Sequence, residues 1–142
     1  MKTKNTDGLK KIIQKRFDDN TEKHIKRRLE TASLLVEGTA KENIQRGPKT
    51  GKVYKRRGIE HQSSAKGEYP ATNTGFLVSN IGHTTVKHEG TKYVAKVFSS
   101  APYSKFLEFG TRKMGERPFL QPSLERNVEK IEGLFKKGGF LK

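Results

Sequence analysis

The chain has 142 residues, of which 31% are hydrophobic and 32% are charged. This length suits one domain with a modest core, and the low hydrophobic content predicts long exposed elements or contacts with partners. Thirty lysines and arginines against fifteen acidic residues give a net charge of +15, which favours a polyanion or an acidic protein surface as the partner. Because the sequence contains no cysteine, disulfides and thiolate metal sites are excluded.

The sequence shows no targeting segment. Its apolar runs are far shorter than a membrane span. The N-terminal residues MKTKNTDGLKK lack the apolar middle of a signal peptide. We therefore expect a soluble protein that is made in the cytoplasm of its host and has no membrane partner.

Residues 8–46 are predicted to form one long helix, with Asp7 as its cap and Gly47-Pro48 as its stop. Apolar residues recur at helical spacing along it. They are Leu9, Ile12, Ile13, Phe17, Ile25, Leu29, Ala32, Val36, Ala40 and Ile44. A helix of this length is about 60 Å long, so we expect part of it to meet solvent or a neighbouring subunit.

Residues 47–68 are predicted to form a flexible basic loop or a mobile hairpin, because they are rich in glycine and cations and poor in apolar residues. GPKTGK resembles a phosphate-binding loop, but it has three residues between its glycines instead of four. The candidate residues for contact with a partner or with DNA phosphates are Lys49, Lys52, Tyr54, Lys55, Arg56 and Arg57. A solvated loop, or one that meets an acidic protein surface, explains the same residues equally well.

The remaining residues, 69–142, are predicted to form a small antiparallel sheet with a C-terminal helix packed on it, which makes the fold α+β. Thr74 is expected to cap a helical turn, and strands are expected at residues 79–88 and 91–99, around Glu89-Gly90. The last helix is expected to start near Pro122 and to end at Gly138-Gly139. Its predicted buried stripe is Leu124, Val128, Ile131, Leu134 and Phe135.

Residues 101–120, APYSKFLEFGTRKMGERPFL, are predicted to form a structural corner in which Gly110 reverses the chain. The aromatic and aliphatic residues expected to bury against the sheet and the last helix are Tyr103, Phe106, Leu107 and Phe109. Glu108 is expected to pair with Lys105 or Arg112. The loop TRKMGER is the part of this corner most exposed to partners, so Glu108, Arg112, Lys113 and Arg117 are candidates for a subunit or connector interface.

Nothing in the sequence indicates an enzyme or a cofactor. His24, His61, His83 and His88 do not form a metal-ligand pattern, and no GxSxG elbow is present. We therefore expect no catalytic, cofactor-binding or metal-binding residues.

Three motifs in order, GEYPATNTGFLVSNI, PYSKFLEFGT and RPFLQPSLERNVEKI, resemble the tail-completion, or head-tail joining, proteins of long-tailed bacteriophages. The resemblance covers about residues 8 to 137. Its structural motif residues include Pro70, Thr74, Gly75, Tyr103, Gly110, Pro118 and Phe119. Phe76 and Ser123 depart from the family pattern, which more often has a basic residue and an alanine there.

The resemblance implies a non-enzymatic α+β virion protein at the neck end of the tail. Such a subunit forms a ring, expected to be a hexamer, on the tail tube protein, and joins it to the connector or stopper proteins of the head. Non-specific contact with DNA in the channel is an additional expectation, since phosphates attract cations. Two alternatives remain open, namely a tail terminator that caps the tube and a basic, non-sequence-specific nucleic-acid-binding accessory protein.

Overall fold

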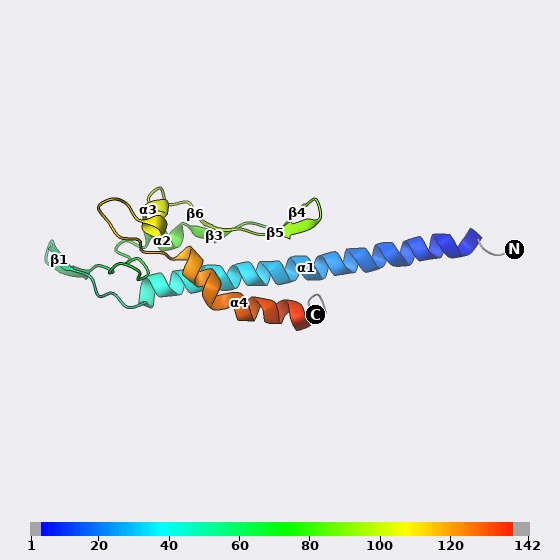
Figure 1. The fold of residues 1–142 in the computed structure, drawn as a ribbon, viewed down its shortest axis with the longest axis horizontal. Helices are drawn as coiled ribbons and strands as arrows, with labels where there is room; N and C mark the ends of the chain where they lie inside the picture. The colour runs from blue at the N-terminus through cyan, green and yellow to red at the C-terminus, as the bar shows by residue number, and fades with distance from the viewer. Residues whose placement is uncertain (1–3, 138–142) are drawn as a thin grey trace.

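The computed structural model describes residues 4–137, with backbone only for residues 4–7. It has four helices and six short strands in this range, arranged along one long helix (Figure 1). In chain order they are α1 (Lys4–Arg46), β1 (Val53–Arg56), β2 (Ile59–Gln62), α2 (Phe76–Ser79), β3 (Ile81–His83), β4 (Lys87–Glu89), β5 (Lys92–Val94), β6 (Val97–Ser99), α3 (Ser104–Phe109) and α4 (Leu120–Lys137). The α+β prediction is confirmed, while the predicted stop at Gly138-Gly139 lies outside the described residues.

The long helix α1 is confirmed as a single unbroken element of 43 residues, which at 1.5 Å per residue is about 65 Å long. It begins at Lys4, so Asp7 lies within the helix and not at its start. At its other end the Gly47 N–H donates to Asn43 O at 2.9 Å. A Cβ at Gly47 would lie 2.3 Å from that oxygen, so only glycine fits this helix end.

Residues 53–62 form a β-hairpin, the more ordered of the two predicted forms of the basic segment. Its antiparallel register pairs Tyr54 with His61 and Lys55 with Glu60. Both turn residues have positive φ, +51° at Arg57 and +78° at Gly58, as in the type I′ turns that suit two-residue hairpins. The hairpin projects from the end of the molecule where α1 terminates (Figure 1).

Strands β3 to β6 form a second, longer hairpin that lies along α1 (Figure 1). Its tip is a two-residue turn, Gly90-Thr91, in which Gly90 has a φ of +62°. The turn lies one residue later than the predicted Glu89-Gly90. Between the paired strands, three residues (84–86) face two residues (95–96). This extra residue interrupts the ladder in the manner of a β-bulge.

The core lies where the C-terminal third of α1 meets α2, β3 and the start of α4. Its buried side chains are Ala40, Ile44, Tyr69, Leu77, Val78, Ile81, Ala101 and Phe119. Phe119 and Ile44 are fully buried, so the fold is organised around this end of the molecule. The N-terminal half of α1 extends beyond it (Figure 1).

Helix α4 packs antiparallel against α1, whereas the sequence had predicted that it packs on the sheet (Figure 1). Its buried residues are Ser123 and Asn127, whereas Leu124 and Val128 are 51% and 41% exposed. The Asn127 amide donates to Thr39 Oγ1 at 2.8 Å, and the Ser123 hydroxyl lies 3.1 Å from Tyr69 Oη. These hydrogen bonds orient the helix. The predicted stripe is therefore exposed at Leu124 and Val128 and only partly buried at Ile131, Leu134 and Phe135.

Candidate functional site

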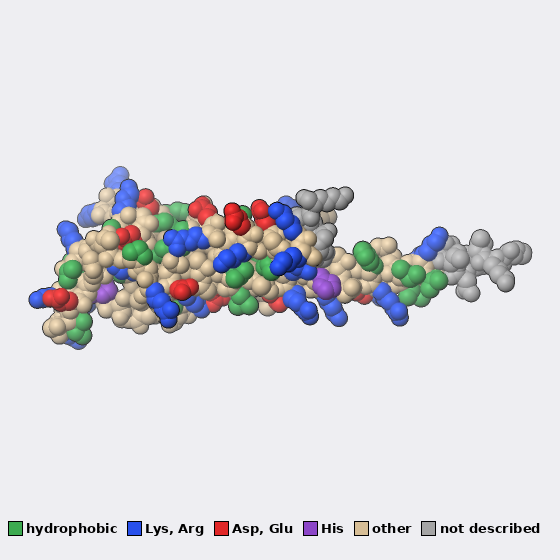
Figure 2. All heavy atoms as spheres, turned by 90° about the horizontal axis from the view of Figure 1, so that it is seen from below, with side chains coloured by type: hydrophobic (Ala, Val, Ile, Leu, Met, Phe, Trp, Pro, Cys, Tyr) green, Lys and Arg blue, Asp and Glu red, His purple; other side chains and the backbone are tan. Residues whose placement is uncertain are grey.

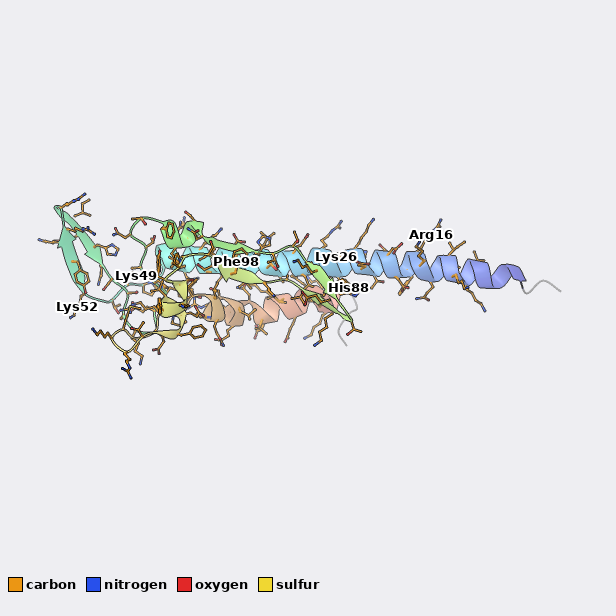
Figure 3. The ribbon with its side chains drawn as sticks, turned by 90° about the horizontal axis from the view of Figure 1, so that it is seen from above. Arg16, Lys26, Lys49, Lys52, His88 and Phe98 are labelled. Carbon is orange, nitrogen blue, oxygen red and sulfur yellow. The ribbon has the colours of Figure 1, made fainter. Side chains whose placement is uncertain are left out.

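An open apolar groove of about 680 Å³ runs between α1, the β3–β6 hairpin, α3 and α4. Its floor is formed by residues of α1, and its walls by residues of the hairpin and of α4. The principal apolar lining residues are Leu29, Ala32, Val36, Val97, Phe98, Phe109, Leu120, Leu124 and Ile131. Phe98, which Figure 3 labels, is 43% exposed at the edge of the groove, so the groove is accessible to a partner.

A second apolar surface lies on the N-terminal half of α1. Leu9, Ile12, Ile13 and Phe17 are 53% to 67% exposed, although their spacing places them on one helix face. Figure 2 shows hydrophobic and basic side chains together on this extended half of the helix. The predicted stripe of α1 therefore divides into a buried C-terminal part and an exposed N-terminal part.

Glu108 contacts the start of α4. The sequence had predicted an ion pair with Lys105 or Arg112, and that prediction is wrong. Its Oε2 accepts hydrogen bonds from the N–H groups of Phe119 at 2.9 Å and Leu120 at 3.1 Å, and its Oε1 accepts one from Gln121 at 2.9 Å. The first N–H groups of a helix have no partner within the helix, and they favour a negative charge. Glu108 is therefore the cap of α4, supplied from α3.

Arg117 also makes its contacts within the chain. Its Nε and Nη2 donate to Ser64 O at 3.1 and 3.0 Å, and its Nη1 donates to Gly115 O at 3.0 Å. It thereby ties the loop before α4 to the segment after the basic hairpin. Arg112 and Lys113 are exposed, and the interface role of all four candidate residues stays a prediction.

The predicted corner at residues 101–120 is confirmed at Gly110 but wrong about its aromatic residues. Gly110 has a φ of +77° and a ψ of 178°, and a Cβ there would lie 2.9 Å from Glu116 N, so glycine is required. Phe109 is 82% exposed, and Tyr103 and Phe106 are 41% and 45% exposed. Phe119 supplies the buried ring of the corner, because Glu108 holds its backbone against α3.

A smaller groove, of about 450 Å³, brings together residues from the separate sequence motifs. Pro70, Thr74, Gly75, Tyr103 and Arg117 line it, beside Tyr54 and His61 of the basic hairpin. Gly75, with a φ of +76°, is the cap residue of α2, so Thr74 is one residue too early to be the predicted cap. Four of the motif residues, Pro70, Thr74, Gly75 and Tyr103, therefore share one surface at the base of the hairpin, whereas Gly110, Pro118 and Phe119 do not line it.

The predicted phosphate-contact residues do not form one uniform patch. Lys49 caps the end of α1, because its Nζ donates to Gly47 O at 3.0 Å and Asn43 O at 3.2 Å. Partial burial lowers the pKa of Lys49, although the charge of Glu68 acts in the opposite direction. Figure 3 shows Lys49 near the end of α1 and Lys52 at the start of the hairpin segment.

The hairpin itself carries the exposed candidates. Tyr54 and Arg56 share one face of the hairpin, and Lys55 lies on the other, where its Nζ is 2.9 Å from Glu60 Oε1. Arg57 occupies the turn. Lys52, Arg56 and Arg57 are exposed cations at this end of the molecule and are the strongest candidates for contact with phosphates.

Glu68 closes the base of the hairpin, a role that the sequence did not predict. Its Oε2 accepts hydrogen bonds from Thr50 N at 3.0 Å and Ala65 N at 2.8 Å, and its Oε1 accepts one from the Thr50 hydroxyl. The Thr50 hydroxyl, together with the two backbone N–H groups, lowers the pKa of Glu68 below its ordinary value of 4.5. The hairpin is therefore anchored at its base while its strands are exposed.

The chain matches a model of a known protein family. A family model described as "Bacteriophage HK97-gp10, putative tail-component" matches residues 7–110, which is most of the chain. The chain belongs to this HK97 gp10-like family. No curated protein and no solved structure matches the chain.

Membership of the HK97 gp10-like family confirms the resemblance to phage tail and neck proteins and implies a location in the virion. The match covers α1 to α3 and ends at Gly110, before α4. It also argues against an enzyme, since the family is a structural tail component. Among residues 8–137, whose side chains the structure describes, no group of three His, Cys, Asp or Glu is placed to hold a metal ion.

This family member also carries a partly buried charge cluster that no local sequence pattern indicates. Glu37 of α1 accepts hydrogen bonds from Lys41 and from His83 Nδ1 of β3, the latter at 2.5 Å. Partial burial alone would raise the pKa of Glu37, but the hydrogen bonds from Lys41 and His83 outweigh it and hold that pKa below 4.5. The cluster fixes the β3–β6 hairpin to α1.

In the part of the chain that the structure describes, no helix is both long and apolar enough to cross a membrane.

Proposed function

We propose that this tail component forms a ring on the tail tube and joins the phage tail to the head connector. The observation that carries the proposal is that the chain leaves two apolar surfaces exposed, the groove beside α4 and the N-terminal stripe of α1. Contiguous apolar surfaces on a folded subunit mark sites of protein–protein contact. A subunit built in this way buries its apolar surface fully only in an assembly.

The proposed ring is a hexamer whose partners are the tail tube protein on one face and the connector or stopper proteins of the head on the other. The predicted interface loop, with Arg112 and Lys113, is available for these contacts because both side chains are exposed. The net charge of +15 suits a ring around DNA, since cations near the phosphates need no base recognition.

Removal of the gene tests this proposal. We expect full heads with normally packaged DNA and free tails to accumulate separately, and addition of the purified protein to join them. Intact infectious particles in the absence of the protein would contradict the proposal. Tail length in the same mutant separates the joining role from the alternative of a tail terminator, because a missing terminator gives tubes of unregulated length.

The second candidate is a basic nucleic-acid-binding accessory protein, favoured by the exposed cations of the β1–β2 hairpin. It predicts that the isolated chain binds duplex DNA with a steep dependence on salt concentration. It also predicts normal joining of heads and tails when those cations are neutralised. Failure to join with retained DNA binding would favour docking on protein.

A further inference from the structure

We infer that the apolar groove of one copy receives the N-terminal stripe of α1 from a second copy. The groove is the space lined by α1, the β3–β6 hairpin, α3 and α4, and the stripe is Leu9, Ile12, Ile13 and Phe17. This inference rests on the proposed function and deepens it, because it names the contact between neighbouring subunits of the proposed ring.

The shape of the stripe fits the groove. The stripe belongs to a regular helix and has the i, i+3, i+4, i+8 spacing of helices that bind in apolar grooves. The groove follows α4 from Leu120 to Ile131, a rise of roughly 17 Å for a helix. From Leu9 to Phe17 the stripe rises roughly 12 Å along α1, so the groove is long enough to receive it.

The stripe of a chain cannot fill the groove of the same chain. Both lie on α1, since Leu29 and Val36 form part of the floor of the groove. Phe17 precedes Leu29 by twelve residues on an unbroken helix, which separates them by roughly 18 Å along its axis. A second copy can supply the stripe without any change in the helix.

The charges beside the two surfaces are complementary. Basic residues flank the stripe, namely Lys10, Lys11, Lys15 and Arg16. Exposed acidic residues follow one edge of the α4 stripe, namely Glu125, Glu129 and Glu132. Figure 2 shows acidic side chains gathered over α4, and Figure 3 shows Arg16 on the extended half of α1. Such charges fix the orientation and register of a helix that docks on its apolar side.

The contact is heterologous, because different surfaces of the two copies meet. A heterologous contact leaves one free stripe and one free groove at the ends of every open chain of subunits, and only a closed ring removes them. It therefore provides the type of interface that a ring on a tail tube requires. A contact between two copies of the stripe would instead give an isolated dimer.

The test uses two variants of the full chain, Ile13→Asp in the stripe and Leu124→Asp in the groove. Both side chains are more than half exposed in the folded chain, at 58% and 51%, so both variants should fold. By light scattering with size-exclusion chromatography, we expect the wild type to form oligomers and each variant to be monomeric. Gln14→Asp, which adds the same charge off the stripe, should keep the wild-type mass.

The decisive measurement is a mixture of the two variants. Ile13→Asp retains an intact groove and Leu124→Asp an intact stripe, so the mixture should form a one-to-one dimer and nothing larger. A monomeric wild type, or a mixture that stays monomeric, would overturn the inference. If circular dichroism shows that Leu124→Asp is unfolded, Phe98→Asp replaces it, because Phe98 also lines the groove and is 43% exposed.

The proposed function has a separate readout, so the two can fail independently. If the mixture stays monomeric but removal of the gene still leaves heads and tails apart, the joining role is supported and the proposed contact between copies is wrong. A stripe variant that blocks joining without changing the mass of the isolated chain would place the stripe against the tube or connector, and would equally overturn the inference.

Discussion

The carboxylate of Glu108 accepts a hydrogen bond of 2.9 Å from the backbone N–H of Phe119, eleven residues later in the chain. The same carboxylate accepts the N–H groups of the next two residues, so it holds the first turn of α4 against the end of α3. The packing of Phe119 in the core and the direction of α4 therefore depend on one side chain outside that helix.

Replacement of Glu108 by alanine should lower the free energy of unfolding by about 1–2 kcal/mol, because the first N–H groups of α4 lose their acceptor. Denaturant unfolding followed by circular dichroism measures this change. Glu129→Ala, which removes an exposed carboxylate of α4 that does not cap its first turn, is the matched control and should have little effect. An unchanged stability with failed joining would assign Glu108 to the subunit interface.

Truncation of Phe119 to alanine should cost about 3–5 kcal/mol, since its fully buried ring leaves a cavity in the core. Phe109→Ala removes the same ring where it is 82% exposed, and should change the free energy of unfolding by less than about 1 kcal/mol. Melting temperatures of the two variants provide the comparison. Equal losses would show that the core does not depend on Phe119 in particular.

The free energy of unfolding should decrease at acidic pH, because Glu37 becomes protonated. Its pKa is lower in the folded chain than the ordinary value of 4.5, so the ionised carboxylate stabilises the fold above that value. This contribution should disappear as the pH falls through the lowered pKa, when the contacts with Lys41 and His83 lose their negative partner. Melting temperatures of wild type and Glu37→Gln should therefore differ at pH 7 and converge as the pH falls below the lowered pKa of Glu37.

The matched control for this pH series is Glu30→Gln, an exposed carboxylate on the same helix. It should follow the wild type at every pH. A difference between wild type and Glu37→Gln that persists at low pH would mean that the amide disturbs packing, and that titration of Glu37 does not explain the acid sensitivity.

Neutralisation of the exposed cations of the hairpin segment should weaken DNA binding and reduce its dependence on salt. We expect this for the triple variant Lys52→Gln, Arg56→Gln and Arg57→Asn, in which asparagine tolerates the left-handed turn at residue 57. Fluorescence anisotropy with duplex DNA at several salt concentrations measures the slope, which should fall by about one unit for each lost phosphate contact.

A triple variant of the other hairpin, Lys87→Gln, Lys92→Gln and Lys96→Gln, removes the same charge from exposed positions. It should bind DNA more tightly than the first variant does. Equal losses in both variants would indicate attraction by net charge alone and would remove the β1–β2 hairpin as a specific contact.

Substitution of Arg117 separates a structural role from an interface role in the loop before α4. Arg117→Lys cannot reproduce the paired contacts with Ser64 O, and should lower the free energy of unfolding by about 1–2 kcal/mol. Lys113→Ala, at an exposed position of the same loop, should leave the unfolding curve unchanged. If Lys113→Ala still impairs joining of tails to heads, the exposed part of the loop contacts a partner.

Local sequence patterns were sufficient for several elements of this protein. The spacing of apolar residues predicted α1, because residues three and four apart lie on one side of a helix. Gly110 was predicted to end a short helix because glycine lacks a Cβ, and its φ of +77° confirmed this. The ordered motifs predicted the phage tail family, which the family match over residues 7–110 confirmed.

Tertiary structure decided which surfaces of these elements are buried. The last helix was predicted to pack on the sheet, but it packs against α1, and hydrogen bonds of Ser123 and Asn127 to Tyr69 and Thr39 hold its polar face inward. Those partners are 54 and 88 residues away, so no local pattern contains them. The same holds for Glu108, whose acceptor role requires the start of α4 to lie beside α3.

The sequence by itself thus determined where helices, turns and charged segments occur, since these depend on neighbours within a few residues. It did not determine whether an apolar face meets its own core or another molecule, because hydrophobic spacing is identical in the two cases. Only the folded chain distinguishes them. Its core is complete at one end of α1, and the remaining apolar faces are left exposed.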